Sequence, residues 1–163
     1  MSDIRLKRLH LLKAAIIIVR LLVGSTFIIS GWSKAIDPWG FVFKIDDYLN
    51  VWGWEVAREI SLSGAIALSC IEFLTGILIA TGCLRRLSVW LGALMMAFML
   101  PLTVYIYVAD PVSDCGCFGD FIVLSNAATL IKNIVLSALL IFLIMYGAKI
   151  KGIFSPYIQW LVI

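Results

Sequence analysis

The sequence has little charge and almost no histidine. Only 14% of its 163 residues are charged and His10 is its single histidine, whereas 63% of the residues are hydrophobic. Soluble domains carry about 25% charged residues, so we expect the surplus apolar surface to face a lipid bilayer. One histidine is too few for a multi-histidine zinc site, and it weighs against haem ligation or a Cys–His nucleophile. We therefore predict no such metal site.

Basic residues are also too few and too scattered for a nucleic-acid surface. The formal net charge is only +3, and no strip combines aromatic and basic residues as in single-strand binders. The basic residues stand instead beside the apolar runs, where they orient a membrane protein. We predict no nucleic-acid partner.

Four apolar runs are long enough to cross a bilayer, which takes roughly 20 residues. They span about residues 14–32, 63–81, 88–108 and 128–146. Backbone groups in lipid must be hydrogen-bonded within their own segment, so each run is predicted to be a helix. Arg20 interrupts the first run and no small-residue cleavage site follows, which favours a retained helix over a signal peptide. The predicted fold is an all-α membrane protein, with residues 1–163 forming one four-transmembrane-helix bundle.

The basic residues between the runs predict the orientation. Four precede the first run, two lie in the 82–87 turn and two in the tail, whereas the other side has only Lys34, Lys44 and Arg58. Because the cytoplasmic side is the richer in Lys and Arg, we predict cytoplasmic N- and C-termini in a bacterial inner membrane. Residues 37–60 and 109–127 then lie on the periplasmic side.

The first periplasmic segment predicts a short amphipathic helix at about residues 38–52. It starts with Asp37-Pro38, a helix-start signal. Apolar residues then recur at helical spacing, namely Phe41, Ile45, Tyr48, Leu49 and Trp52. We predict that this helix lies on the membrane surface, either as a lipid-facing brace or as a dock for a partner protein.

The second periplasmic segment, residues 109–127, holds Cys115 and Cys117 on either side of Gly116. Disulfides persist in the periplasm, and Gly116 gives the backbone freedom that a very small ring needs. Such a ring departs from relaxed disulfide geometry and stabilises little, so it should be reduced easily. These properties favour a redox-active dithiol. Two alternatives stay open: a structural pair, and a soft-metal site such as Cu(I), which lacks methionine-rich surroundings here.

Charged residues near the loop are expected to tune these thiols. Asp114 and Asp120 would raise a thiol pKa, whereas Lys132, near the periplasmic end of the fourth run, would lower it. The alternative for Lys132 is to snorkel to the interface. Cys70, about two turns below the periplasmic surface, is the one thiol placed to receive electrons from the pair, although such cysteines are usually small core residues.

Three charged residues, Arg20, Glu72 and Lys132, lie inside the predicted helices, and each would cost several kcal/mol if it faced lipid unpaired. With antiparallel helices and a rise of 1.5 Å per residue, Arg20 and Glu72 fall about 5 Å apart in depth. We therefore predict a buried Arg20–Glu72 ion pair. Either it fixes the register of the helices, or it belongs to a proton relay or to the rim of a quinone pocket.

Three stretches resemble the DoxX superfamily and, within it, the redox-associated MauE branch. The first carries Arg20, Gly24, Phe27, Ser30, Gly31, Lys34, Asp37 and Pro38, the second Glu72, Gly76 and Gly82, and the third Asp114-Cys115-Gly116-Cys117-Phe118-Gly119-Asp120, followed by Leu124, Ser125, Thr129, Lys132 and Asn133. The resemblance implies a four-helix inner-membrane bundle, often encoded with or fused to periplasmic thioredoxin-like proteins. MauE members are linked to the maturation of a disulfide-rich methylamine dehydrogenase.

Together these features predict a thiol–disulfide oxidoreductase. Cys115 and Cys117 would exchange electrons with a separate periplasmic thioredoxin-like protein, and Cys70 or a quinone would take part in onward transfer. Four-helix quinone-linked thiol oxidases suggest the quinone by analogy of fold alone. One alternative is a non-catalytic membrane scaffold or maturation factor, as in methylamine utilisation, and another is a soft-metal-handling membrane protein. A homo-oligomer is left open.

Overall fold

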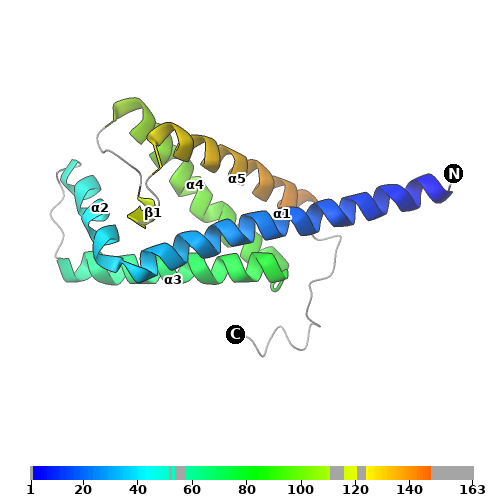
Figure 1. Cartoon of the computed structure of the whole chain (residues 1–163), viewed down its shortest axis with the longest axis horizontal. Helices are drawn as coiled ribbons and strands as arrows, with labels where there is room; N and C mark the ends of the chain where they lie inside the picture. The colour runs from blue at the N-terminus through cyan, green and yellow to red at the C-terminus, as the bar shows by residue number, and fades with distance from the viewer. Residues whose placement is uncertain (1, 52, 54–57, 111–115, 121–123, 148–163) are drawn as a thin grey trace.

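The computed structural model describes residues 2–51, 53, 58–110, 116–120 and 124–147. Its elements are, in chain order, α1 Ser2–Ile36, α2 Pro38–Val51, α3 Arg58–Thr81, α4 Arg85–Ala109, β1 Cys117–Asp120 and α5 Asn126–Tyr146. The four long helices run along the bundle, whereas α2 and β1 lie at the end away from the N-terminus (Figure 1).

Four helices are long and apolar enough to cross a membrane. The candidate spans are Leu6–Ile36, Glu59–Thr81, Arg85–Ala109 and Asn126–Tyr146. The prediction of an all-α bundle with four membrane spans is therefore confirmed, and the chain is a multi-pass membrane protein. The four-residue β1 is the only strand in the described part of the chain.

Helix α1 extends beyond the predicted apolar run, because it ends at Ile36 rather than at residue 32. Pro38 disfavours helical geometry in the residue before it, so the chain turns at Asp37 and not at the first polar residues. Asp37 then caps α2, since its Oδ1 accepts a hydrogen bond of 2.9 Å from the Gly40 backbone N–H. Lys34 consequently belongs to the helix and not to a loop.

Glycines let α1 and α3 touch backbone to backbone. A Cβ built on Gly31 would lie 2.5 Å from the backbone nitrogen of Phe73, and one built on Gly76 would lie 2.6 Å from that of Ile28. A larger side chain would force the helices apart, so this is the small-residue packing typical of membrane helices. The crossing fixes the register of α1 against α3.

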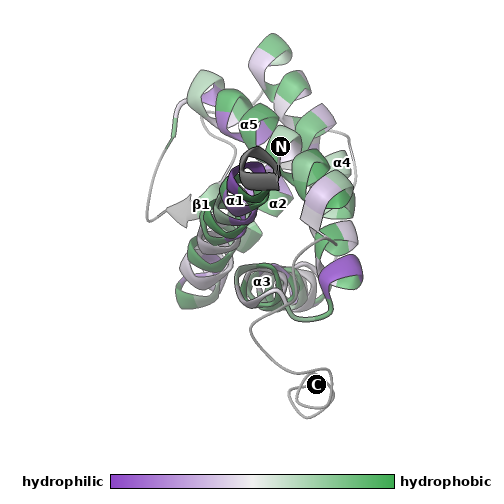
Figure 2. Cartoon of the chain, turned by 90° about the vertical axis from the view of Figure 1, so that its right-hand side faces the viewer, coloured by the Kyte–Doolittle hydropathy of each residue, from purple (hydrophilic) through white to green (hydrophobic). Residues whose placement is uncertain are grey.

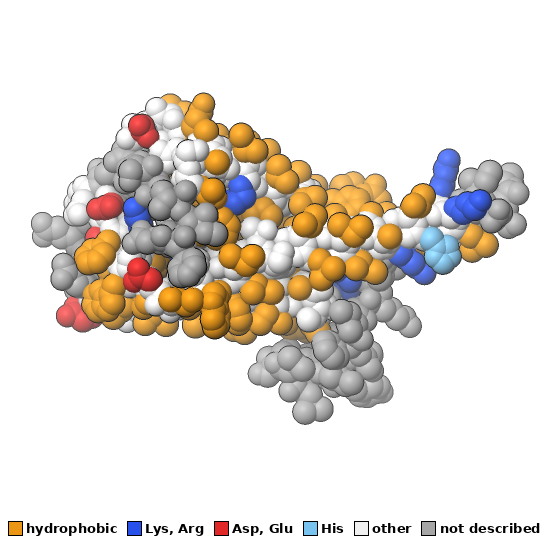
Figure 3. All heavy atoms as spheres, in the orientation of Figure 1, with side chains coloured by type: hydrophobic (Ala, Val, Ile, Leu, Met, Phe, Trp, Pro, Cys, Tyr) orange, Lys and Arg blue, Asp and Glu red, His pale blue; other side chains and the backbone are white. Residues whose placement is uncertain are grey.

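A buried apolar core lies between the long helices. Its members are Ile16, Val23, Phe27, Ile79, Val89, Met96, Leu136, Leu140 and Leu143. Hydrophobic residues predominate along all four long helices (Figure 2). Many other large apolar side chains are exposed, and they cover much of the visible face of the bundle (Figure 3). An outer surface of this kind is favourable in lipid, because its apolar side chains are then not exposed to water.

The apolar face of α2 packs on the protein. Phe41 is 6% exposed and Val42 is fully buried, and both join Ala65 of α3 in a second apolar cluster, against which Ile45 packs. The predicted helix at 38–52 is present, but its Phe41 and Ile45 face meets α3 rather than the membrane surface. These side chains are shielded from water by α3 and do not need the membrane for this purpose. Trp52 lies outside the described residues.

The two ends of the bundle differ in charge. Acidic side chains gather at the end formed by α2 and β1, and basic side chains gather around the N-terminal part of α1 (Figure 3). This is the asymmetry on which the predicted orientation rests. The orientation itself stays a prediction.

Candidate functional site

A lysine and a glutamate form a buried ion pair between α1 and α3. Lys34 Nζ lies 2.6 Å from Glu72 Oε2, and the two side chains are only 1% and 12% exposed. Burying two charges is costly unless they are paired, so the pair joins the two helices at this depth. The ring of Phe41, whose centroid lies 5.0 Å from Lys34 Nζ, covers the ammonium from α2.

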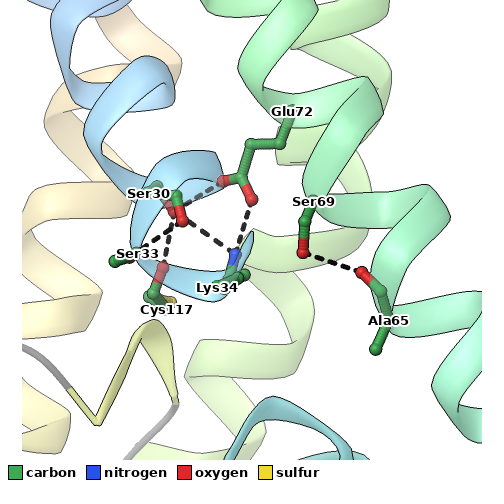
Figure 4. A network of polar contacts seen from close by, with 7 residues as sticks. All are labelled: Ser30, Ser33, Lys34, Ala65, Ser69, Glu72 and Cys117. Atoms are coloured by element: carbon green, nitrogen blue, oxygen red, sulfur yellow. Dashed lines mark hydrogen bonds and ion pairs between the residues drawn. The ribbon is translucent and has the colours of Figure 1, made fainter. Parts of the chain in front are cut away.

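Ser30 connects this ion pair to the cysteine loop. Its Oγ lies 2.7 Å from Glu72 Oε1 and 2.5 Å from the Cys117 carbonyl oxygen, and Lys34 Nζ donates to it over 3.3 Å (Figure 4). A serine hydroxyl has one hydrogen, so it serves the carboxylate or the carbonyl, not both. Lys34 Nζ donates to the same hydroxyl oxygen, so the ion pair and the loop meet at one serine side chain.

Two more lysines contact the same loop. Gly116 has a φ of +64°, in the left-handed region, and a Cβ there would lie 2.9 Å from Lys44 Cγ. Lys132 Nζ lies 4.4 Å from the centroid of the Phe118 ring, a cation–π contact worth about 0.5–2 kcal/mol depending on its exposure. Residues 116–118 are thus held by α2, α1 and α5 in turn.

A small cavity of about 30 Å³ borders Cys117. It has room for about one water-sized group. Its walls include the Lys34–Glu72 pair, Ser30 and Lys132, and three methionines of α4 complete one side. The methionines are Met95, Met96 and Met99.

A larger, apolar cavity of about 150 Å³ also borders Cys117. Its apolar walls come from α2, α3 and α4. They include Phe41, Ile45, Leu49, Leu68, Phe98 and Leu102. Among the described residues of its lining, Lys34 is the one that carries a charge, so the cavity combines an apolar wall with a buried ammonium.

The structure places only part of the predicted redox site. Cys115 and Asp114 lie outside the described residues, so a Cys115–Cys117 pair stays a prediction. Asp120 is the last residue of β1, and its side chain is outside the description. Cys70 is exposed on α3 and lines neither cavity beside Cys117, so the structure does not bring these two thiols together.

The predicted ion pair between Arg20 and Glu72 is wrong. Glu72 pairs with Lys34, whereas Arg20 donates a hydrogen bond of 2.8 Å to the carbonyl oxygen of Gly147, at the end of α5. Arg20 therefore belongs to the opposite part of the bundle from the cysteine loop.

The register of the α1–α3 crossing explains this difference. Gly31 abuts Phe73, which places Ser30 next to Glu72. Arg20 comes ten residues before Ser30, about 15 Å along the helix at 1.5 Å per residue. The predicted depths of Arg20 and Glu72 were wrong because they were counted from the ends of the apolar runs, whereas the helices extend beyond those runs.

Ser30 and Lys34 are functional candidates that the apolar pattern alone does not reveal. Lys34 follows Ser30 by four residues and so shares its helix face, and Asp37-Pro38 places the helix end beyond both. Those two signals together would have kept Lys34 inside the helix. The methionines of α4 give no such signal, because only the folded chain brings them to Cys117.

Comparison with known proteins gives one result. The model of the family described as methylamine utilisation protein MauE matches residues 12–146. This range contains the ion pair, the described part of the cysteine loop and the lining of both cavities beside it. No curated protein and no solved structure matches the chain.

Proposed function

This chain belongs to the MauE family, and from this premise we propose that it is a membrane-bound thiol–disulfide exchange protein. Cys115 and Cys117 act on the periplasmic side of a bacterial inner membrane, on a separate thioredoxin-like protein. The observation that carries the proposal is the attachment of Cys117 to a buried ion pair through Ser30. A loop that served only to connect α4 with α5 would not need such an anchor.

The revised place of Lys34 supports the proposed orientation. Lys34 counted as one of three basic residues on the periplasmic side, but it is buried in α1. Without it the excess of Lys and Arg on the opposite side grows, which strengthens the argument for cytoplasmic termini.

Exchange begins when the thiolate of one loop cysteine attacks a disulfide sulfur of the partner. The S–S bond of the partner breaks, a mixed disulfide forms, and the other partner sulfur leaves as a thiolate. The second loop cysteine then attacks the mixed disulfide. This step closes the Cys115–Cys117 disulfide and releases the partner as a dithiol, so two electrons have passed to the partner. The reverse sequence oxidises the partner and reduces the loop.

Two contacts of the described residues support this exchange. Ser30 holds the backbone of Cys117, and Lys132, beside Phe118, brings a positive charge to the loop. A nearby cation favours the thiolate, which is the attacking form. Lys34 donates to the Ser30 oxygen and leaves the Ser30 hydrogen available for the Cys117 carbonyl, so the ammonium supports the bond that holds the loop.

The apolar cavity beside Cys117 fits a quinone better than the pocket that the sequence suggested beside an Arg20–Glu72 pair. An apolar cavity of about 150 Å³ is large enough for one benzene-sized ring, and Phe98 in its wall is 64% exposed. Lys34 would orient a ring oxygen. A bound quinone would supply the capacity to accept two electrons from the dithiol.

Trapping the partner tests the proposal. In cells that express the full chain with Cys115→Ser, Cys117 should accumulate as a mixed disulfide with an exported protein, because the resolving thiol is missing. Alkylation followed by mass measurement should show the wild-type pair in both dithiol and disulfide forms. A Cys70→Ser/Cys83→Ser variant is the control and should exchange as the wild type does.

Two results would contradict the proposal. If a Cys115→Ser/Cys117→Ser variant kept full activity in cells, the chain would be a non-catalytic scaffold or maturation factor. If the pair stayed permanently reduced, or stayed oxidised in mild reductant, it would not be an exchange site.

The methionines beside Cys117 favour a second candidate, a soft-metal site. Thioethers and a thiolate are the ligands that select Cu(I), and Met95, Met96 and Met99 line the same small cavity as Cys117. The neighbouring Lys132 opposes a cation there. Binding of one Cu(I) per reduced chain, lost in Met95→Leu/Met99→Leu, would support this candidate. No stoichiometric binding would rule it out.

A further inference from the structure

A cavity of about 190 Å³ lies between the spanning helices, away from the cysteine loop. All four long helices contribute to it: Arg20 from α1, Ile79 from α3, Arg85 and Arg86 from α4, and Leu143 from α5. It shares no lining residue with the two cavities beside the loop. Its function must therefore be sought separately from thiol chemistry.

The lining of this arginine cavity is strongly positive. Three arginines border it, and no Asp or Glu is among its described lining residues. Arg20 is only 6% exposed and spends one of the five N–H donors of its guanidinium on the Gly147 carbonyl. Because a buried cation is stable only when it is paired or well hydrogen-bonded, this arrangement favours an anion in the cavity.

The first turn of α4 adds backbone donors to the same wall. Arg85 and Arg86 open this 25-residue helix, and the residue before them, Leu84, makes no side-chain capping hydrogen bond. The first N–H groups of a helix have no partner within the helix, and its N-terminus carries a partial positive charge. Helix N-termini bind phosphate for both reasons.

The rim of the cavity is apolar and accessible from the lipid side. Trp90 is 62% exposed and Ile144 is also exposed, and both line the cavity. Tryptophan is enriched at the level of lipid headgroups, and basic pockets between membrane helices bind anionic headgroups. We propose that the arginine cavity binds the phosphate of an anionic phospholipid, whose acyl chains lie against the exposed faces of α4 and α5.

Lipid retention tests this site in the intact chain. The full-length protein is purified in detergent, offered equal amounts of phosphatidylglycerol and phosphatidylcholine, and examined by native mass spectrometry for bound lipid. Wild type should retain phosphatidylglycerol preferentially, and Arg85→Gln/Arg86→Gln should lose that preference by roughly fivefold for each arginine. The matched control is Arg8→Gln/Lys13→Gln, which removes two exposed charges from the N-terminal part of α1. This control should keep the preference.

Other outcomes overturn the proposal. Equal losses in the two double variants would reduce it to general surface attraction. A thermal stabilisation by inorganic phosphate as large as that by phosphatidylglycerol would point to a soluble anion. No preference for the anionic lipid in wild type would leave the cavity to another occupant, such as the chain's own C-terminal segment. If the double variant does not fold, Arg86→Gln alone, on an exposed side chain, gives the same comparison.

Discussion

Removing the charge of Lys34 should destabilise the bundle. In a Lys34→Met variant, Glu72 would stay only 12% exposed and would lose the cation that lies 2.6 Å away. At an effective dielectric constant of about 20, the attraction lost at this distance is about 6 kcal/mol. Part of this loss is offset, because the variant no longer has to remove a lysine ammonium from water when it folds. Breaking a buried pair from one side typically costs about 3–5 kcal/mol. We expect this loss in the free energy of unfolding.

The same substitution should loosen the cysteine loop. Without the ammonium, the Ser30 hydroxyl should donate to the unpaired carboxylate of Glu72, and the Cys117 carbonyl then loses its donor. Glu72→Gln should have the opposite effect on the loop, because the amide can donate to Ser30 and leave its hydroxyl for Cys117. Both variants leave a buried charge unpaired and lose stability, but only Lys34→Met should release the loop.

Two measurements separate these effects. Denaturant titration in detergent micelles gives the free energy of unfolding, and the rate of maleimide alkylation gives the accessibility of Cys117, in a chain whose other three cysteines are serine. Lys13→Met, on the exposed part of α1, is the matched control and should change neither quantity. Equal alkylation rates in Lys34→Met and Glu72→Gln would refute the coupling, as would a stability of Lys34→Met equal to that of Lys13→Met.

Paired glycine substitutions test the helix crossing and the loop. Gly31→Ala would place a Cβ 2.5 Å from a backbone nitrogen of α3 and should cost about 2 kcal/mol of unfolding free energy or more, whereas Gly64→Ala, with open space around it, should stabilise its helix by up to about 1 kcal/mol. Similar unfolding curves for the two would contradict the close crossing. Gly116→Ala and Gly53→Ala both meet a positive φ, which costs roughly 1–2 kcal/mol. Only Gly116→Ala also presses on Lys44, so it alone should speed alkylation of Cys117, and an equal rate in Gly53→Ala would count against that contact.

The membrane spans could be predicted from the sequence because their signal is local. A run of about 20 apolar residues has few alternatives to a spanning helix, and each predicted run lies within a helix of the structure. The helix ends were harder to place. Lys34 looks like the start of a loop, and only its partner on α3 makes it stable inside the bundle.

The contacts of the site could not be predicted because they depend on register. Whether Arg20 or Lys34 is the partner of Glu72 depends on how far α1 is shifted along α3. The hydropathy pattern of the two helices does not distinguish these registers. Backbone contact at Gly31 decides it. The approach of Lys132 to Phe118 likewise depends on how the loop folds back on α5, which no local pattern encodes.

The tight α1–α3 crossing also predicts that the two ends of the bundle respond independently. Lys34 of α1 lines the small cavity beside the cysteine loop and Arg86 of α4 lines the arginine cavity, and the described linings of these two cavities have no residue in common. Effects of substitutions more than about 7–10 Å apart without shared partners add to within about 0.5 kcal/mol. The unfolding free energy of Lys34→Met/Arg86→Gln should therefore equal the sum of the single effects, and Arg86→Gln should leave the alkylation rate of Cys117 unchanged. A larger interaction energy would mean that α1 shifts as one body between its ends. In that case lipid bound at the arginines would act on the thiols, and the rigid crossing inferred from Gly31 would be incorrect.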